Sequence, residues 1–274
     1  MDFNTNYTPE QQAFRIAIGG WLNEHAPKNL RFPPDGSPLN AETQAIVKEF
    51  RLKLGEKGWL APSWPREIGG GGLSASFYVV LMEEMRRFDM PSMGDNTRWV
   101  PAMMVWGTDE QKKRFIPPSL RGETITWQTF NEPDSGSDFA TVHTTAVPEE
   151  GGYRITGTKA FITGRFDPDY LVTLAVTDPE RPRRYNLGVF MIDATLPGIE
   201  IKTMRMLMGS ERRVFFDNVF VPDDCLIGPP FQGWEIAYSI IEAERGGAAF
   251  RLSEDGTIES IYTYLKDQRS EQDS

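Results

Sequence analysis

The first third of the chain repeats apolar side chains at helical spacing. Thr8, Pro9 and Gln11 have the arrangement of a capping box with proline at the first helical position. From Phe14 to Leu22 the apolar residues then recur at intervals of three and four. We therefore expect a helix here that packs one face into a core.

Further helices are expected over residues 41–57 and 74–87, and a second capping box, Thr108 with Gln111, begins another. Glycine- and proline-rich stretches separate them, among them the four glycines of residues 69–72. Because these glycines join two helices instead of following a strand, we interpret them as a flexible turn and not as a nucleotide-binding loop. The N-terminal part is predicted to be a helical bundle.

From about residue 124 the apolar period changes to two, and β-branched and aromatic residues become frequent, as in strands. The strand-like runs cover residues 124–130, 153–163, 170–177, 187–193, 199–204 and 213–222. A helical pattern returns at Trp234 and fades into a polar tail that we expect to be disordered, with a short helix near residues 258–266.

The predicted fold class is α+β and multidomain. We expect an N-terminal helical bundle over residues 1–122, a middle antiparallel β-barrel or sandwich domain over residues 123–229, and the remnant of a C-terminal helical domain over residues 230–274. At 274 residues the chain is long enough to build this many cores.

Composition narrows the class of partner. The chain has 39 acidic and 29 basic residues, and the resulting formal charge of −10 repels nucleic acid and anionic membranes. The single cysteine, Cys225, permits no internal disulfide, and we find no signal peptide and no apolar run that approaches the ~18 residues of a membrane span. We expect a cytoplasmic protein that binds neither nucleic acid nor membrane.

Metal and hydrolase chemistry have little support. The two histidines, His25 and His143, are far apart, and no metal-ligand spacing or nucleophile elbow accompanies them. We therefore predict no metal site.

The stretch "NEPDSGSD", residues 131–138, directly follows the first strand-like run. Its proline and glycine turn the chain away from the strand, and the small residues Ser135, Gly136 and Ser137 leave successive backbone N–H groups uncovered. Such a loop is either a polar turn in which aspartate and serine satisfy their own backbone, or a cradle for an anionic or heteroaromatic ligand.

The stretches "NEPDSGSDFATVHTTAV", "GGYRITGTKAFITG", "FFDNVFVP" and "LIGPPFQGWEIA" with a later "ER" resemble the acyl-CoA dehydrogenase family in order and approximate spacing. The resemblance extends from the N-terminal helices to about Arg245. The matching positions are Glu132, Pro133, Gly136, Ser137, Asp138, Gly157, Lys159 and Thr163. It implies flavin adenine dinucleotide (FAD) held between a helical N-terminal domain, a middle β domain and a C-terminal helical domain.

The resemblance also implies which residues would contact the cofactor. Two segments would lie along the flavin ring, with Thr163 close to its reactive nitrogen. The chain departs from the usual family pattern at Asn131, where threonine or serine is common, and at Phe161, where tryptophan is usual. The candidate cofactor contacts are Gln128, Phe130, Asn131, Ser137, Phe161, Ile162 and Thr163.

The helix that begins near Trp234 offers the candidate base. At about 100° per residue it presents one apolar stripe with Arg245 at its centre and Glu244 at its edge. Some members of the family place the catalytic glutamate at the position of Glu244, and others place it on a later loop. The alternative is that Glu244 and Arg245 form an ion pair at a domain seam. The predicted stripe comprises Trp234, Ala237, Tyr238, Ile241, Arg245 and Ala248. The candidate substrate contacts are Ser137, Glu242 and Arg245.

The resemblance implies an acyl-CoA dehydrogenase, or a subunit of one, that acts in fatty acid or lipid catabolism and passes electrons to an electron-transfer flavoprotein. Because most of the C-terminal helical domain is expected to be missing, we anticipate a homo- or hetero-oligomer with another acyl-CoA dehydrogenase chain. A catalytically silent truncated subunit that stabilises a full-length partner without holding FAD is the alternative. A binding module for acyl-CoA is the third reading.

Overall fold

The computed structural model describes residues 7–28, 30, 32–33, 37–88, 93, 97–207 and 209–246. The helices are α1 (Pro9–His25), α2 (Ala41–Glu56), η1 (Arg66–Ile68), α3 (Ala75–Arg87), α4 (Val100–Trp106), α5 (Asp109–Leu120), η2 (Phe139–Thr141), η3 (Asp223–Cys225) and α6 (Gly233–Gly246). The strands are β1 (Thr126–Thr129), β2 (Thr145–Glu149), β3 (Gly152–Ile162), β4 (Tyr170–Val176), β5 (Leu187–Asp193), β6 (Ile199–Arg205), β7 (Ser210–Pro222) and β8 (Leu226–Ile227). The predicted fold class is confirmed. The helix expected near residues 258–266 lies outside the described residues.

Both predicted capping boxes are present. Thr8 and Gln11 exchange side-chain and backbone hydrogen bonds at the start of α1, and Thr108 and Gln111 do so at the start of α5. Gln111 also joins α5 to the end of the sheet, because its side-chain amide donates to the carbonyl oxygen of Leu226 at 2.8 Å. The cap of α5 therefore also fixes where that helix sits against the β domain.

The glycines of residues 69–72 are tightly packed, so the expectation of a flexible turn is wrong. The backbone N–H of Gly71 donates to Ala61 O at 3.0 Å, and that of Gly72 donates to Trp64 O at 2.8 Å. A Cβ on Gly70 would lie 2.2 Å from Trp64 O. Glycine is used here because two backbone segments lie in contact, a property that the sequence pattern does not reveal.

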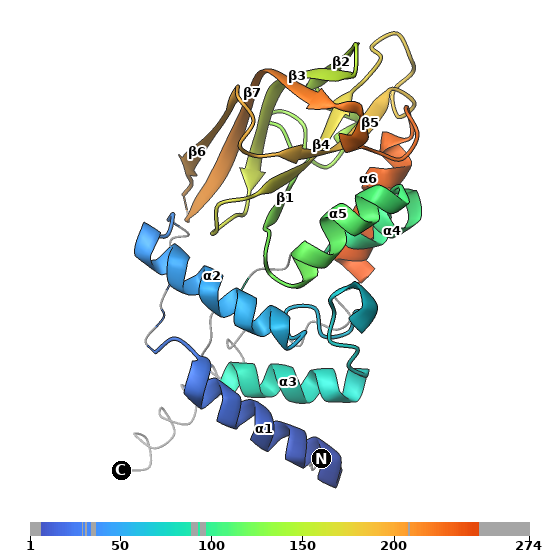
Figure 1. Cartoon of the computed structure of the whole chain (residues 1–274). Helices are drawn as coiled ribbons and strands as arrows, with labels where there is room; N and C mark the ends of the chain where they lie inside the picture. The colour runs from blue at the N-terminus through green and yellow to red at the C-terminus, as the bar shows by residue number, and fades with distance from the viewer. Residues whose placement is uncertain are drawn as a thin grey trace, which may run out of the picture.

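The strands form one eight-stranded sheet in the order β6-β7-β3-β2-β4-β5-β8, with β1 beside β4. Most neighbours are antiparallel, but β1 runs parallel to β4, with Gln128 opposite Val172. Figure 1 shows α4, α5 and α6 grouped against one flank of this sheet, with α1, α2 and α3 below it. Strand β2 was not predicted, because three of its five residues are exposed and its alternation is weak.

The two faces of β4 belong to different cores. Val172 and Leu174 pack with residues of α4, α5 and α6, whereas Leu171 and Ala175 pack with β3, β5 and β7 inside the β domain. A third core lies between α1, α2 and α3. The period of two along β4 therefore places α4, α5 and α6 on one side of the strands that lead to the candidate site.

Helix α6 is rotated relative to the predicted stripe. Ile236, Ala237 and Ile240 are fully buried, whereas Tyr238 and Arg245, both assigned to the apolar face, are exposed. The first residue of the helix lies against the sheet, because a Cβ on Gly233 would be 2.5 Å from the backbone of β5. The predicted stripe member Ala248 lies outside the described residues.

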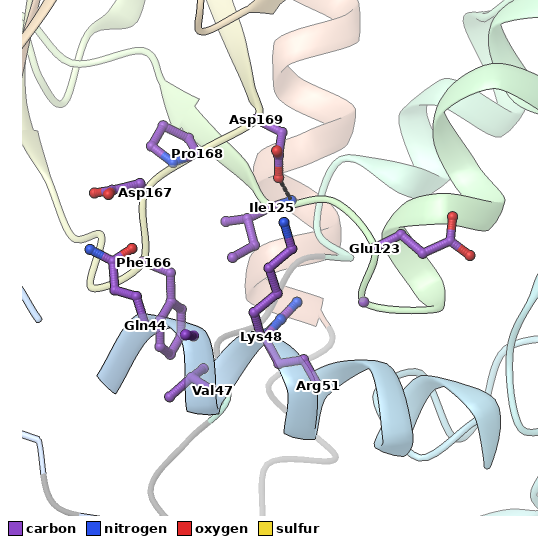
Figure 2. A pocket seen from close by; sticks show the side chains of 12 residues that line it. Gln44, Val47, Lys48, Arg51, Glu123, Ile125, Phe166, Asp167, Pro168 and Asp169 are labelled. Atoms are coloured by element: carbon purple, nitrogen blue, oxygen red, sulfur yellow. Dashed lines mark hydrogen bonds between the residues drawn. The ribbon is translucent and has the colours of Figure 1, made fainter. Parts of the chain in front are cut away.

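A pocket of about 260 Å³ lies at the seam between α2 and the β domain. Figure 2 shows Lys48 extending from α2 into this pocket, which Ile125 and Asp169 also line. That carboxylate accepts the backbone N–H of Ile125 at 2.7 Å, and Arg51 in the pocket wall is 2% exposed. None of the predicted site residues lines this pocket.

Candidate active site

The two segments predicted to enclose a ligand lie side by side. Immediately after β1, the carbonyl oxygen of Asn131 accepts the backbone N–H of Ala160 on β3 at 2.9 Å. This bond brings the segment from Gln128 to Ser137 against the segment from Phe161 to Thr163. We refer to the two segments together as the β1–β3 corner.

The backbone of β3 is irregular at this corner. The register between β3 and β7 shifts between Lys159 and Ile162, and Phe161 adopts a left-handed φ of 57°. The ring of Phe161 is 43% exposed, while the side chain of Ile162 is 5% exposed. A bulge of this kind re-aims a side chain, and a left-handed conformation is rare for a bulky residue. The sequence placed Phe161 at the site but gave no sign of this conformation.

The loop "NEPDSGSD" is in part the self-satisfied polar turn that was one interpretation of it. Ser135 and Asp138 satisfy neighbouring groups, because the Ser135 hydroxyl lies 2.7 Å from Thr141 Oγ1 and the Asp138 carboxylate accepts the N–H of Ala140. By contrast, Gly136 and Ser137 are exposed, and their backbone N–H groups have no acceptor within the described part of the chain. Ser135 and Asp138 are thus satisfied within the turn, and the Gly136 and Ser137 between them present free backbone donors.

The side chain of Gln128 leaves a buried acceptor without a partner. It lies on the same side of β1 as Phe130, which packs in the core shared with α4, α5 and α6. Within the described residues, Gln128 Oε1 is buried and accepts no hydrogen bond. Because buried polar atoms are nearly always bonded, this oxygen marks a place for a donor that the described residues do not supply.

Thr163 lies just beyond β3 and is exposed. Its hydroxyl donates to the carboxylate of Glu211 at 3.2 Å, across the β3–β7 pair. The next residue, Gly164, lies against Trp127, where a Cβ would be 2.3 Å from the indole ring. The contact between Gly164 and Trp127 holds the backbone next to Thr163 in place.

A buried ion pair holds the corner together. Lys159 is fully buried and Glu132 is 3% exposed, and the ammonium lies 2.8 Å from the carboxylate. Burial by itself raises the pKa of Glu132, but the ammonium of Lys159 and the hydrogen bonds from Thr144 and His143 outweigh it, so the pKa lies below its usual 4.5. Burial lowers the pKa of Lys159 to about 8, against the opposing effect of Glu132. Both groups are therefore charged at pH 7.

Replacing Glu132 by glutamine is expected to reduce the acid sensitivity of the fold. Since the folded pKa of Glu132 is lowered, the ionised carboxylate stabilises the folded chain above about pH 4.5, and that stability is lost as the pH falls through the folded pKa. Urea unfolding between about pH 5 and pH 2 should show a smaller loss of free energy of unfolding in Glu132→Gln than in the wild type. An equal loss of free energy of unfolding in the two proteins would contradict the lowered pKa of Glu132.

The candidate base pairs with a residue that sequence reasoning did not identify. Arg98, just before α4, donates to Glu244 Oε1 at 2.5 Å, and both side chains are about one-third exposed. The residues Glu242 and Arg245 of α6 are exposed. The alternative prediction was an ion pair between Glu244 and Arg245 at a domain seam. Glu244 does form an ion pair, but its partner is Arg98. In "NTRWV" no local pattern distinguishes Arg98 from any surface arginine.

Helix α6 packs beside the corner, in the core that also contains Phe130. Phe139, directly after the loop, stacks on Trp234 with ring centroids 4.3 Å apart. Glu244 lies ten residues further along α6, about 15 Å at 1.5 Å per residue. The described structure therefore places the cofactor candidates at the corner, together with the substrate candidate Ser137. The candidate base and the other two substrate candidates, Glu242 and Arg245, lie on the far part of α6.

Comparison with known families decides the assignment. The sequence profile "Acyl-CoA dehydrogenase, N-terminal domain" matches residues 8–123, and the profile "Acyl-CoA dehydrogenase, middle domain" matches residues 128–219. The chain belongs to the acyl-CoA dehydrogenase family. Members of this family are FAD-dependent oxidoreductases.

Similar proteins include two acyl-CoA dehydrogenases of Mycobacterium tuberculosis. FadE34 is 34% identical over 238 residues, which cover 85% of this chain and 34% of FadE34. FadE29 is 28% identical over 258 residues, which cover 93% of this chain and 65% of FadE29. The chain thus spans less than two thirds of the length of these relatives.

Solved acyl-CoA dehydrogenase structures have the same architecture. The Tcur3481-Tcur3483 steroid ACAD superposes with a TM-score of 0.77 at 26% identity, over 96% of this chain and 68% of that chain. An acyl-CoA dehydrogenase from Geobacillus kaustophilus superposes with a TM-score of 0.71 at 26% identity, over 89% of this chain and 64% of that chain.

The residues of the corner fit the family cofactor. A flavin carries ring N–H and carbonyl groups and an aromatic face, and the corner offers the buried acceptor of Gln128, the free N–H groups of Gly136 and Ser137, and the exposed ring of Phe161. No group of metal-binding side chains occurs among the described residues. Nor does the described part of the chain contain a helix of the length and apolarity needed to cross a membrane.

Proposed function

We propose that this chain is an acyl-CoA dehydrogenase, or a subunit of one, which holds FAD at the β1–β3 corner and removes hydrogens from Cα and Cβ of an acyl-CoA thioester. The juxtaposition of the two segments supports it most directly. Asn131 and Ala160 are hydrogen-bonded to each other, so the start of the loop lies next to the segment that carries the exposed Phe161.

The residues proposed to hold FAD are Gln128, Phe130, Asn131, Ser137, Phe161, Ile162 and Thr163. When bound, FAD supplies the acceptor for the hydride that leaves Cβ. The Asn131 amide and the Ser137 backbone would donate to the ring system and stabilise negative charge on it. The Thr163 hydroxyl would do so after turning away from its present acceptor, Glu211. Phe161 supplies an aromatic wall that excludes water from one side of the site.

Glu244 is the proposed base for the α-proton, with Ser137, Glu242 and Arg245 as proposed substrate contacts. In the described structure the guanidinium of Arg98 occupies one carboxylate oxygen of Glu244, at 2.5 Å. Proton transfer to the other oxygen leaves this bond in place, and Arg98 then orients the carboxylate. We propose a cytoplasmic location, a role in lipid catabolism and electron transfer to an electron-transfer flavoprotein.

The same ion pair favours the second candidate function, a catalytically silent subunit. A carboxylate committed to Arg98 serves to join α6 to α4 and needs no catalytic role. The similar Tcur3481-Tcur3483 steroid ACAD is named for two different chains, and a partner of the same family is proposed for this chain as well. In this reading the partner holds the flavin.

Colour distinguishes the two functions. The purified chain, expressed alone and with a candidate partner, is expected to show flavin absorbance that bleaches when acyl-CoA is added without oxygen. A useful panel contains hexanoyl-CoA, isovaleryl-CoA and cyclohexanecarboxyl-CoA, because chain length, branching and ring size are all open. A chain that is colourless alone and bound to a yellow partner would instead support the silent subunit.

Thr163→Val is expected to shift the flavin absorbance spectrum while leaving thermal stability close to that of the wild type. The hydroxyl is exposed and its removal costs only one surface hydrogen bond, to Glu211. Thr203→Val on β6, also exposed, is the matched control and should leave the spectrum unchanged. An unaltered spectrum in Thr163→Val would remove Thr163 from the flavin site.

A further inference from the structure

The ion pair between Glu132 and Lys159 joins three separate segments. Besides contacting the carboxylate, the Lys159 ammonium donates to the carbonyl oxygen of Phe130 at 3.2 Å. The Glu132 carboxylate also accepts the backbone N–H groups of His143 at 2.6 Å and Thr144 at 2.9 Å. The residues just after β1, Lys159 near the end of β3 and the residues just before β2 therefore all meet at this buried ion pair.

A glycine makes this convergence possible. A Cβ on Gly157 would lie 2.4 Å from Thr144 Oγ1 and 2.7 Å from Thr144 Cα, so only glycine allows β3 to lie so close to the start of β2. Its φ of 157° is also at the limit of what other residues adopt. This close approach brings the N–H groups of His143 and Thr144 within reach of Glu132.

The Glu132–Lys159 ion pair lies directly beside the left-handed Phe161 and the register shift of β3. Lys159 precedes the Asn131-bonded Ala160 and the left-handed Phe161, so the register shift of β3 begins at the lysine. On the other segment, Glu132 begins the turn that leads to the free N–H groups of Gly136. A bulky residue in a sparsely populated conformation persists only where its surroundings fix it.

We propose that Glu132 and Lys159 are positioning residues that hold the Phe161 ring and the open Gly136–Ser137 backbone in a fixed relation, so that they form one binding wall. The identity of the bound group as a flavin rests on the proposed function, but the positioning itself does not. An exposed ion pair could not do this, because water screens it and its partners move freely. Burial of both side chains and four hydrogen bonds hold the pair in one arrangement.

The test uses the full chain with 4-fluorophenylalanine at position 161, observed by ¹⁹F nuclear magnetic resonance without any flavin. We expect a single resonance in the wild type, and a shifted, broadened or doubled resonance in Lys159→Met and in Glu132→Gln. The second variant keeps one acceptor oxygen and the side-chain shape, so it preserves the test if Lys159→Met does not fold. Glu149→Gln is the matched control: it weakens the exposed pair with Arg154 in the same sheet and should leave the resonance unmoved.

FAD titration of the unlabelled proteins supplies the second readout. A dissociation constant at least about tenfold higher in Glu132→Gln than in Glu149→Gln is expected, which corresponds to about 1.4 kcal/mol. An unmoved ¹⁹F resonance in both Lys159→Met and Glu132→Gln would overturn the proposal. So would a moved resonance with unchanged FAD affinity. If the wild-type chain binds no FAD, the proposed function fails, and the ¹⁹F comparison alone decides the positioning role.

Discussion

Glu244→Gln is expected to lower the rate of flavin reduction by acyl-CoA about 10²- to 10⁴-fold, the range usual for loss of a general base. Glutamine keeps the size of the side chain and one acceptor oxygen for Arg98, so α6 should stay in place. Flavin absorbance before substrate addition should therefore equal that of the wild type. Anaerobic stopped-flow absorbance with the three acyl-CoA probes measures the rate.

The matched control is Glu235→Gln, an exposed position on the first turn of the same helix. In this variant, acyl-CoA should reduce the flavin at the wild-type rate. Arg98→Met separates the two roles proposed for Glu244, because removing the guanidinium leaves the carboxylate present but no longer oriented. If Glu244→Gln reduces at the wild-type rate while Arg98→Met lowers the melting temperature, Glu244 is a structural ion-pair partner and the base lies elsewhere.

Gly55→Ala is expected to destabilise the fold by up to about 3 kcal/mol, the upper part of the usual range for overpacking. In most helices the same change stabilises by about 0.5–1 kcal/mol, because alanine loses less backbone freedom on folding. Gly55 is the exception because a Cβ there would lie 1.9 Å from Arg121 O. The clash is with backbone, so no side-chain rotation relieves it.

Gly20→Ala is the matched control within α1, where nothing lies within 4 Å of the added methyl group. Urea unfolding should therefore give opposite signs for the two variants, a stabilisation for Gly20→Ala and a destabilisation for Gly55→Ala. Stabilisation by both would show that α2 does not lie against the Arg121 turn. Because that turn leads directly into β1, the close contact at Gly55 also sets where the candidate site lies relative to the N-terminal helices.

Much of the candidate site follows from short-range pattern. Lys159 occupies an inward position of an alternating strand, where an ionisable residue needs a partner, and Glu132 stands in a turn that begins directly after another strand. The family resemblance identified these two residues, and the hydrogen bond between Asn131 and Ala160 brings their segments together. Their pairing with each other was not identifiable, because 27 residues separate them and no local rule connects the two positions.

The sequence by itself determined the helix starts at Thr8 and Thr108, the change of period near residue 124, and the family resemblance of the loop and of β3. These features depend on neighbours within a few residues, so they can be read along the chain. Only the tertiary structure decided the rotation of α6, the Arg98 partner of Glu244, the left-handed Phe161 and the packing of residues 69–72. Each of these depends on close contact between segments far apart in the chain, and periodicity carries no information about which distant backbone a residue will touch.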